Sequence, residues 1–268
     1  MPRSSLPVIQ YWHSLEESPA YLDEQFASFR DLNPGMQHMI FGETEADAFI
    51  ARHFSRREVA AFRACSVPAM QADYFRYCAV LMLGGVYSDV DNTCVAPLDP
   101  LLQGSSPNRL FRRGRERSTI NHFFAFGRRR HPLLGITLEI ATRNIEDRVP
   151  GGVWFTTGPV IFSCLVRLLE FDSIESFQRN AASSHGAALE PTIRSLSRTV
   201  RDRTQVAAAF RDVDVSPTSH LKRWLAKPSG ETLPYKTTSD HWQRWQGPIY
   251  RPQTTESPSG TDGHGRVT

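Results

Sequence analysis

Short apolar runs alternate with longer amphipathic stretches over the first third of the chain. Residues 7–12 form a β-rich run and residues 36–41 a second one, so they predict two strands. Residues 21–32 and 44–54 carry apolar side chains at helical spacing, and residues 55–58 have the capping-box sequence that begins another helix. This order predicts an α/β layered fold whose central sheet is mainly parallel and flanked by helices.

The strongest helical pattern lies in residues 68–83. Its first residue is a proline, which suits a helix start, and Gly84 and Gly85 follow its last apolar position. The apolar stripe along this helix is made by Tyr74, Cys78 and Leu81. Residues 86–90 then have the composition of a strand, which predicts a helix, a sharp glycine turn and a buried strand in succession.

The rest of the chain has weaker patterns. The later predicted elements are a strand at residues 122–126 and helices at residues 132–145 and 159–169. Residues 172–213 are polar and are interpreted as mostly helical. We expect one domain over residues 1–250 and a disordered tail over residues 251–268, where proline, serine, threonine and glycine dominate.

Composition narrows the class of protein. In 268 residues, 40% are hydrophobic and 22% charged, which is typical of a packed globular core. A net charge of +3 gives no reason to expect nucleic acid as a partner. No run reaches the roughly 18 to 20 apolar residues of a membrane span. The four cysteines lack the close pairing of zinc sites, and two of them, Cys78 and Cys164, have apolar neighbours typical of a core. We therefore expect a reducing, cytoplasmic location.

Two carboxylates follow the glycine turn. On an extended strand, residues two apart face the same side, so Asp89 and Asp91 would present their oxygens to one point while Val90 turns to the core. Carboxylates suit hard cations such as Mn²⁺ or Mg²⁺. Ligands of open α/β sheets bind at the carboxyl ends of strands. Taken alone, two aspartates at this spacing are more often solvated residues of a loop. The metal hypothesis therefore depends on the helix, the two glycines and the strand that precede them.

The context resembles a known family. Residues 71–77 (QADYFRY), followed by residues 83–91 (LGGVYSDVD), resemble the signature of glycosyltransferase family 32. That family includes fungal initiating mannosyltransferases and bacterial polysaccharide enzymes, and its signature is shared with large glucosylating toxins. Softer matches lie at residues 8–13, 33–35, 121, 131–132, 157–159 and 241–242. The resemblance implies a GT-A-like fold that binds a nucleotide-diphosphate sugar, a UDP- or GDP-sugar donor, and transfer with retention at the anomeric carbon.

The resemblance also implies roles for residues of the predicted helix. Asp73 would accept hydrogen bonds from sugar hydroxyls, Arg76 would contact the sugar and the diphosphate, and Tyr77, on the same helix face, would also bind the substrate. The alternative is a surface ion pair of Asp73 and Arg76. Asn121 would reach the donor sugar or the acceptor near the reaction centre, or it is simply a polar residue at a strand entry.

Aromatic and imidazole side chains complete the implied site. Trp12 would lie against the nucleotide base, or it is a core aromatic residue. His241 would be the third metal ligand, with Asp240 as a rival, and Trp242 would contact the substrate. The alternative for this segment is a surface loop stabilised by packed tryptophans.

The acceptor is open: a glycan, a lipid-linked molecule or a protein. The arginine-rich residues 109–117 and 128–130 are interpreted as solvated loops, or as a surface for an anionic acceptor or for peripheral contact with the inner membrane surface. Two other functions remain. A metal-dependent phosphohydrolase also uses carboxylates but usually needs more metal ligands. A non-catalytic sugar-nucleotide-binding or effector protein would keep the fold without turnover.

Overall fold

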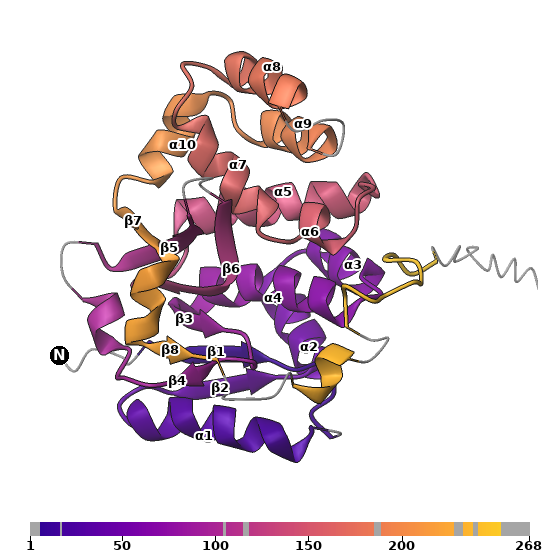
Figure 1. Cartoon of the computed structure of the whole chain (residues 1–268). Coiled ribbons are helices and arrows are strands. Elements are labelled where there is room, and N and C mark those ends of the chain that lie inside the picture. The colour runs from indigo at the N-terminus through magenta and orange to yellow at the C-terminus, as the bar shows by residue number, and fades with distance from the viewer. Residues whose placement is uncertain are drawn as a thin grey trace, which may run out of the picture.

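A central sheet organises the molecule (Figure 1). The computed structural model describes residues 6–16, 18–103, 106–114, 118–184, 189–227, 233–237 and 241–252. In this part of the chain, a six-stranded sheet has the order β2-β1-β3-β6-β5-β7. Its strands are β1 (Val8–Tyr11), β2 (His38–Phe41), β3 (Gly85–Ser88), β5 (Asn108–Arg113), β6 (Ser118–Phe126) and β7 (Val213–Pro217). A small second sheet pairs β4 (Thr93–Cys94) with β8 (Leu225–Ala226).

Most pairs of the central sheet are parallel. β1 runs parallel to both β2 and β3, and β5 runs parallel to β7. β6 is the exception, since it lies antiparallel to β3 and to β5. The α/β architecture with a mainly parallel sheet flanked by helices is therefore confirmed.

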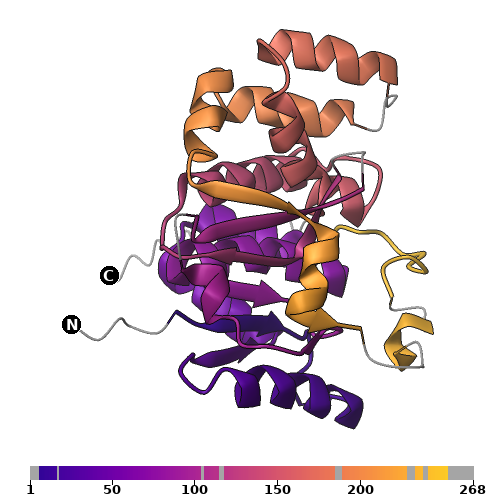
Figure 2. The same cartoon turned by 60° about the vertical axis from the view of Figure 1, so that its left-hand side comes forward.

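Helices cover both faces of the sheet. They are α1 (Asp23–Leu32), α2 (Glu43–His53), α3 (Arg56–Ala64), α4 (Pro68–Leu83), α5 (Pro132–Glu146), α6 (Val153–Thr156), α7 (Val160–Leu168), α8 (Ile174–Ser184), α9 (Glu190–Thr199) and α10 (Arg203–Ala209). α4 contacts β1, β3 and β6 on one face, and α1 lies on the other side of β1 and β2 (Figures 1 and 2). α8, α9 and α10 lie at the end of the molecule opposite α1. The helical interpretation of residues 172–213 is thus confirmed.

The turn from α4 into β3 depends on two glycines. Gly84 and Gly85 have φ of 67° and 96°, a region that side chains with a Cβ rarely adopt. A Cβ at Gly85 would lie 2.1 Å from the carbonyl oxygen of Pro7. That oxygen accepts the Val86 N–H at 2.9 Å and helps to join β3 to β1. The predicted sharp glycine turn is therefore present, and close approach of backbone explains it.

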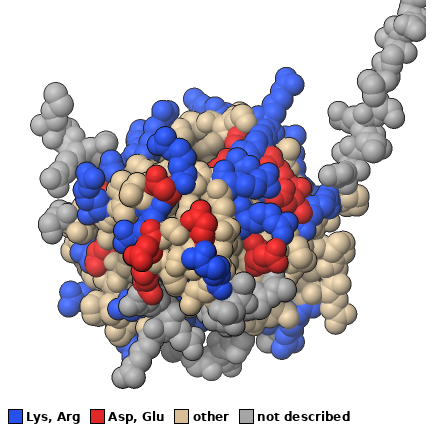
Figure 3. Space-filling model, turned by 90° about the horizontal axis from the view of Figure 1, so that it is seen from above, with Lys and Arg blue, Asp and Glu red and all other residues tan. Residues whose placement is uncertain are grey.

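The predicted loop at residues 109–117 is wrong for its first half. Residues up to Arg113 belong to β5, a strand buried between β6 and β7. Arg109 pairs with Asp214 at 3.0 Å, which allows a strand rich in arginine to lie inside a sheet. Arg128, from the second basic run, pairs with Asp212 at 3.3 Å. On the face seen in Figure 3, basic and acidic side chains are interspersed.

Residues 249–251 lie against the connection between α3 and α4. The Ile249 carbonyl accepts the Ser66 N–H at 3.0 Å, and the Arg251 N–H donates to Ala64 at 2.8 Å. Four short 3-10 helices, η1 (Ala20–Leu22), η2 (Asp99–Leu102), η3 (Thr218–Arg223) and η4 (Pro234–Thr237), complete the described elements. None of the described helices is both long and apolar enough to cross a membrane. The predicted tail lies outside the described residues from position 253 onward.

Candidate functional site

A cavity of about 730 Å³ opens where β1 and β3 end, beside the first half of α4. Its volume lies in the range of small-molecule sites. Almost all the site residues expected from the sequence line it: Trp12, Asp73, Arg76, Asp89, Asp91, Asn121, His241 and Trp242. The sheet brings them together because β1, β3 and β6 are neighbours and α4 packs across all three.

Arg76 forms the junction of the cavity floor. Its side chain is 3% exposed, and its Nη2 lies 2.9 Å from Asp73 Oδ1 and 3.0 Å from Asp89 Oδ1. Its Nη1 donates to the Asn121 carbonyl at 2.7 Å, and the guanidinium lies 4.6 Å from the centroid of the Tyr87 ring. The alternative of a surface ion pair is therefore excluded. A buried cation with two carboxylates and a carbonyl is fixed in one geometry.

Asp73 is held from three directions. Its Oδ1 accepts from Asn121 Nδ2 at 2.8 Å as well as contacting Arg76, and its Oδ2 accepts from the Thr157 hydroxyl at 3.4 Å. Burial raises the pKa of Asp73 to about 6, although Arg76 acts against the rise. The carboxylate faces the cavity with a pKa close to neutral pH, which makes it sensitive to charge nearby.

Tyr77 differs from its expected place. It is fully buried, does not line the cavity, and its hydroxyl donates to the Thr157 carbonyl at 2.8 Å. The same hydroxyl accepts from Asn121 Nδ2 at 3.2 Å. One turn of helix beyond Asp73, Tyr77 points behind the floor rather than into it. It positions Asn121 and Thr157 and does not itself reach a ligand.

The two carboxylates of the motif lie on a turn, so the expected strand over residues 86–90 is wrong at its end. β3 stops at Ser88, and the Asn92 N–H donates to the Asp89 carbonyl at 3.3 Å. Asn92 also donates from Nδ2 to the Ser88 hydroxyl at 3.1 Å, which fixes the turn. Both carboxylates still line the cavity, and Val90 packs into the core as expected. Both carboxylates face the cavity because of this turn and not because of the alternation of side chains along a strand.

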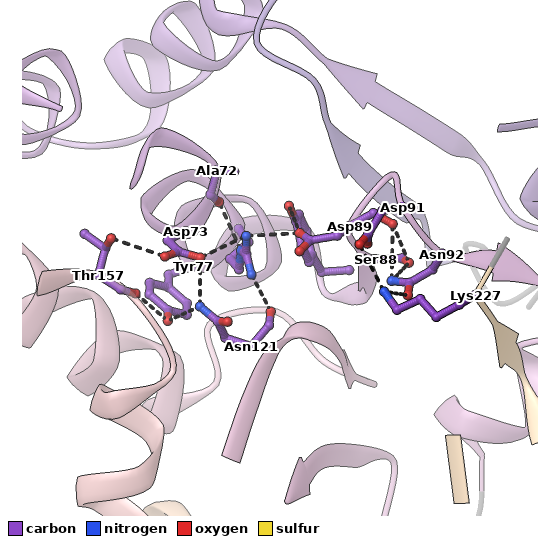
Figure 4. Close-up of polar contacts among 12 residues, drawn as sticks. Ala72, Asp73, Tyr77, Ser88, Asp89, Asp91, Asn92, Asn121, Thr157 and Lys227 are labelled. Carbon is purple, nitrogen blue, oxygen red and sulfur yellow. Dashed lines mark hydrogen bonds and ion pairs between the residues drawn. The ribbon is translucent and has the colours of Figure 1, made fainter. Parts of the chain in front are cut away.

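The two carboxylates have different partners (Figure 4). Asp89 Oδ1 accepts from the Tyr87 hydroxyl at 3.0 Å and contacts Arg76. Asp91 Oδ2 contacts the ammonium groups of Lys227, at 3.0 Å, and Lys236. Burial acts to raise the pKa of Asp91, but these two lysines outweigh it and lower the pKa to about 2. Asp91 is thus a permanent anion at physiological pH.

The expected metal ligands do not form one coordination group. Among the described residues, no three His, Cys, Asp or Glu side chains are close enough together to hold a metal ion. The two lysines contact one oxygen of Asp91, and Arg76 contacts one oxygen of Asp89. The His241 ring packs against Tyr235, with ring centroids 6.0 Å apart. The rival ligand at position 240 lies outside the described residues.

The donor set nevertheless fits a hard cation in part. Asp91 Oδ1 is buried and has no hydrogen-bond partner in the described structure, and the same holds for His241 Nδ1. Carboxylate oxygens are the ligands that Mn²⁺ and Mg²⁺ prefer, and such sites complete their coordination with water and phosphate oxygens. The unpartnered oxygen of Asp91, together with Asp89, provides the protein's share of such a site.

Aromatic side chains line much of the cavity. Trp12 packs with Leu22, Phe26 and Val90, and its Nε1 is buried and finds no acceptor within the described part of the chain. Ring contacts lead from Trp12 through Tyr235 and His241 to Trp242, which stacks on Trp154 with ring centroids 6.0 Å apart and an interplanar angle of 25°. Trp12 therefore combines the two readings of the sequence, since it is packed at the core and also lines the cavity.

Several lining residues were not predicted as site residues, among them His122, Trp154, Lys227 and Lys236. The lysines come from polar stretches with no pattern of their own. Only the pairing of β8 with β4 places Lys227 beside Asn92, and the sequence carries no signal of that pairing. His122 adjoins Asn121 and could have been found by its neighbour. Its pKa is lowered to about 4, mainly by burial, so the imidazole is neutral.

Comparisons with known proteins agree with this geometry. Residues 19–107, which include α4 and both carboxylates, match the family described as the glycosyltransferase sugar-binding region containing the DXD motif. The chain therefore carries a DXD-type glycosyltransferase region, and the resemblance seen in the sequence is confirmed to that extent.

Two curated proteins share this region. The initiation-specific alpha-1,6-mannosyltransferase of Candida albicans is 31% identical over 80 residues, 29% of this chain and 21% of that protein. Mannosyl phosphorylinositol ceramide synthase CSH1 of Saccharomyces cerevisiae is 33% identical over 73 residues, 27% of this chain and 19% of that protein. The matched regions span about a fifth of the length of these relatives. A solved structure described as PaToxG Glycosyltransferase covers 92% of this chain and is itself 89% covered, with 12% identity and a TM-score of 0.43, too low to support an argument.

Proposed function

We propose that this chain, which carries the DXD-containing sugar-binding region of glycosyltransferases, moves a sugar from a UDP- or GDP-sugar to a hydroxyl acceptor with Mn²⁺ or Mg²⁺ as cofactor. The observation that supports it best is the junction at Arg76. One buried guanidinium joins Asp73 of α4 to Asp89 of the motif at the floor of a cavity of about 730 Å³. A sugar and the diphosphate that leaves it need such adjacent sites.

The diphosphate belongs beside the motif in this proposal. Asp91, through its unpartnered Oδ1, and Asp89 would hold the metal ion. When bound, that ion supplies positive charge where negative charge develops on the leaving diphosphate. Arg76 adds a permanent positive charge from the floor, and it would act on the diphosphate through this charge, since its Nη2 and Nη1 already bind Asp73, Asp89 and the Asn121 carbonyl.

The sugar belongs beside Asp73. Its carboxylate faces the cavity and can accept hydrogen bonds from sugar hydroxyls, while Arg76 and Asn121 hold its Oδ1. A carboxylate held in this way orients a sugar and is poorly placed to attack carbon. We therefore propose transfer with retention by attack on the same face. The acceptor oxygen bonds to the anomeric carbon as the bond to the diphosphate breaks, and the hydroxyl proton passes to a diphosphate oxygen.

The aromatic walls would receive the two ends of the reactants. The nucleotide base would lie beside Trp12, where stacking is worth about 1–3 kcal/mol and where Nε1 needs an acceptor. Trp242 and Trp154 lie at the far end of the row of aromatic rings that begins at Trp12, and they would contact the transferred sugar or the acceptor. The acceptor would be a glycan, a lipid-linked molecule or a protein, and transfer assays with each class would identify it.

A thermal-shift screen of UDP- and GDP-sugars with and without Mn²⁺ tests the donor. Ligands that bind the native state raise the unfolding temperature, so the correct donor should do so most strongly with metal present. Release of free sugar from that donor then measures turnover. Release of phosphate from simple esters without dependence on a sugar would support a phosphohydrolase instead, and donor binding without any turnover would support an effector protein.

A further inference from the structure

Two lysines converge on one oxygen of the metal-binding motif. Lys227 Nζ lies 3.0 Å from Asp91 Oδ2 and donates to Asn92 Oδ1 at 3.0 Å, and Lys236 Nζ contacts the same Asp91 oxygen. Two ammonium groups thus share a single carboxylate oxygen, while the other oxygen of Asp91 is buried without a partner. The positive charge exceeds what this one carboxylate balances.

The fold delivers both lysines to this place from the C-terminal part of the chain. Ala226 of β8 pairs with Thr93 of β4, so Lys227 comes to lie next to Asn92 (Figure 4). Lys236 belongs to η4, where its neighbour Tyr235 packs edge-on to Trp12 with ring centroids 5.3 Å apart. Both lysines line the same cavity as Asp73 and Arg76.

The lysine side chains have room to move. The side chain of Lys227 is 57% exposed and that of Lys236 is 28% exposed, whereas the Arg76 side chain is 3% exposed. The Asp91 side chain is 12% exposed, so the lysines are the more accessible partners of these ion pairs, and holding a long lysine side chain in one geometry costs entropy. An ammonium group is a compact charge on a flexible stem with three donors, which suits phosphate oxygens that arrive from solution.

We propose that Lys227 and Lys236 are diphosphate-binding residues that rest on Asp91 and turn to the phosphate oxygens when the donor binds. Their departure leaves Asp91 free to hold the divalent cation. The inference rests on the proposed function, since it assigns residues to the diphosphate end of the same site.

Coupling between the two ligands follows from this exchange. A cation that approaches Asp91 alone meets two ammonium groups and is repelled. A diphosphate that draws the ammonium groups away removes that repulsion, so diphosphate should tighten cation binding and the cation should tighten diphosphate binding by the same factor.

Calorimetry on the full chain tests the proposal. The probes are inorganic pyrophosphate, UDP and GDP, titrated with EDTA present, and Mn²⁺ titrated alone. Lys227→Met and Lys236→Met should each weaken binding of the diphosphate that wild type prefers by about tenfold. Both should also tighten binding of Mn²⁺ alone several-fold, because Asp91 loses a competing cation. Arginine at either position should restore most of the diphosphate affinity and again weaken Mn²⁺.

Lys222→Met is the matched control, since it removes an exposed lysine of the same segment that does not line the cavity. It should behave as wild type with every probe. If both methionine variants bound diphosphate and Mn²⁺ as wild type does, the proposed role of the two lysines would be overturned. The proposed function would still stand in that case, provided that wild type binds the donor with Mn²⁺ present. If wild type bound none of the diphosphates even with Mn²⁺, both proposals would fall.

Discussion

The two sides of the cavity are built in different ways (Figure 4). Around Asp73, the partners Arg76, Asn121 and Thr157 are all buried and come from packed helices and the central sheet. Around Asp91, the partners are two lysines from the C-terminal part, Lys227 with an exposed side chain and Lys236 with a half-buried one. The first side is fixed when the protein folds. The second is held by ion pairs that a ligand can exchange.

The largest effect that separates the two sides concerns Arg76. Arg76→Met leaves Asp73 and Asp89 buried without their shared cation, which should cost about 3–5 kcal/mol in the free energy of unfolding. Lys227→Met should change the free energy of unfolding by less than about 1 kcal/mol, since that lysine is largely exposed. Urea denaturation measures both. Equal losses for the two variants would remove the distinction between a fixed and an exchangeable side.

Asp73→Asn should lower the turnover of the preferred donor by about 10²- to 10³-fold, because a neutral amide is a weaker acceptor for sugar hydroxyls than the carboxylate is. The amide keeps the size of the side chain, so the fold should persist. Asp172→Asn, an exposed position outside the cavity, is the control. Wild-type turnover in Asp73→Asn would show that the fixed side does not hold the sugar.

Stability should respond to pH in opposite ways on the two sides. The folded pKa of Asp73 is raised to about 6, so the folded state favours its protonated form, and its penalty on stability should disappear as pH falls from above 6 towards 4. The folded pKa of Asp91 is lowered to about 2, so its stabilisation is full above about pH 4 and is lost as pH falls towards 2.

Unfolding free energies of wild type, Asp73→Asn and Asp91→Asn between pH 3 and 8 check these signs. The difference between wild type and Asp73→Asn should change between pH 4 and 6, and the difference for Asp91→Asn should change only below about pH 4. Turnover by wild type should fall below about pH 6 as Asp73 takes up a proton. A wild-type turnover that stayed level down to pH 5 would contradict the role given to its ionised form.

On the side of Asp73, the smallest expected effect belongs to Asn121. Asn121→Ala removes the amide that joins Asp73 Oδ1 at 2.8 Å to the Tyr77 hydroxyl at 3.2 Å. It should cost about 1–3 kcal/mol of stability, because buried polar groups lose their partner. Thermal unfolding of Asn121→Ala measures the loss of the hydrogen bond. Thermal unfolding of Asn121→Asp, measured alongside, shows the effect of a buried negative charge added at the same position. No change in Asn121→Ala would mean that Arg76 and Thr157 alone fix Asp73.

The sequence predicts the fixed side well because its signals are local. The helix over α4, the glycine turn and the burial of Val90 follow from spacing within one segment, and Asn121 follows from the family resemblance. The sequence misplaces what depends on pairing between distant segments. The sequence does not predict β5 because its basic run is typical of a loop, whereas in the structure Arg109 of this strand pairs with Asp214 of β7.

The lysines were missed for the same reason. Lys227 reaches the motif only through the β4–β8 pair, and Lys236 only through the contact of Tyr235 with Trp12. Neither lysine belongs to a pattern that marks a phosphate site. The sequence also does not predict the turn after Ser88. A hydrogen bond from Asn92 to the Ser88 hydroxyl holds this turn, and composition alone does not distinguish such a turn from a strand that continues.

The central claim is that Asp89 and Asp91 hold the cation at the donor diphosphate. The most direct measurement is the rate of sugar release from the preferred donor with saturating Mn²⁺, for wild type, Asp89→Asn, Asp91→Asn and the control Asp172→Asn. We expect each motif variant to lose at least about 100-fold in rate while Asp172→Asn keeps the wild-type rate. Full activity in both motif variants would contradict the account.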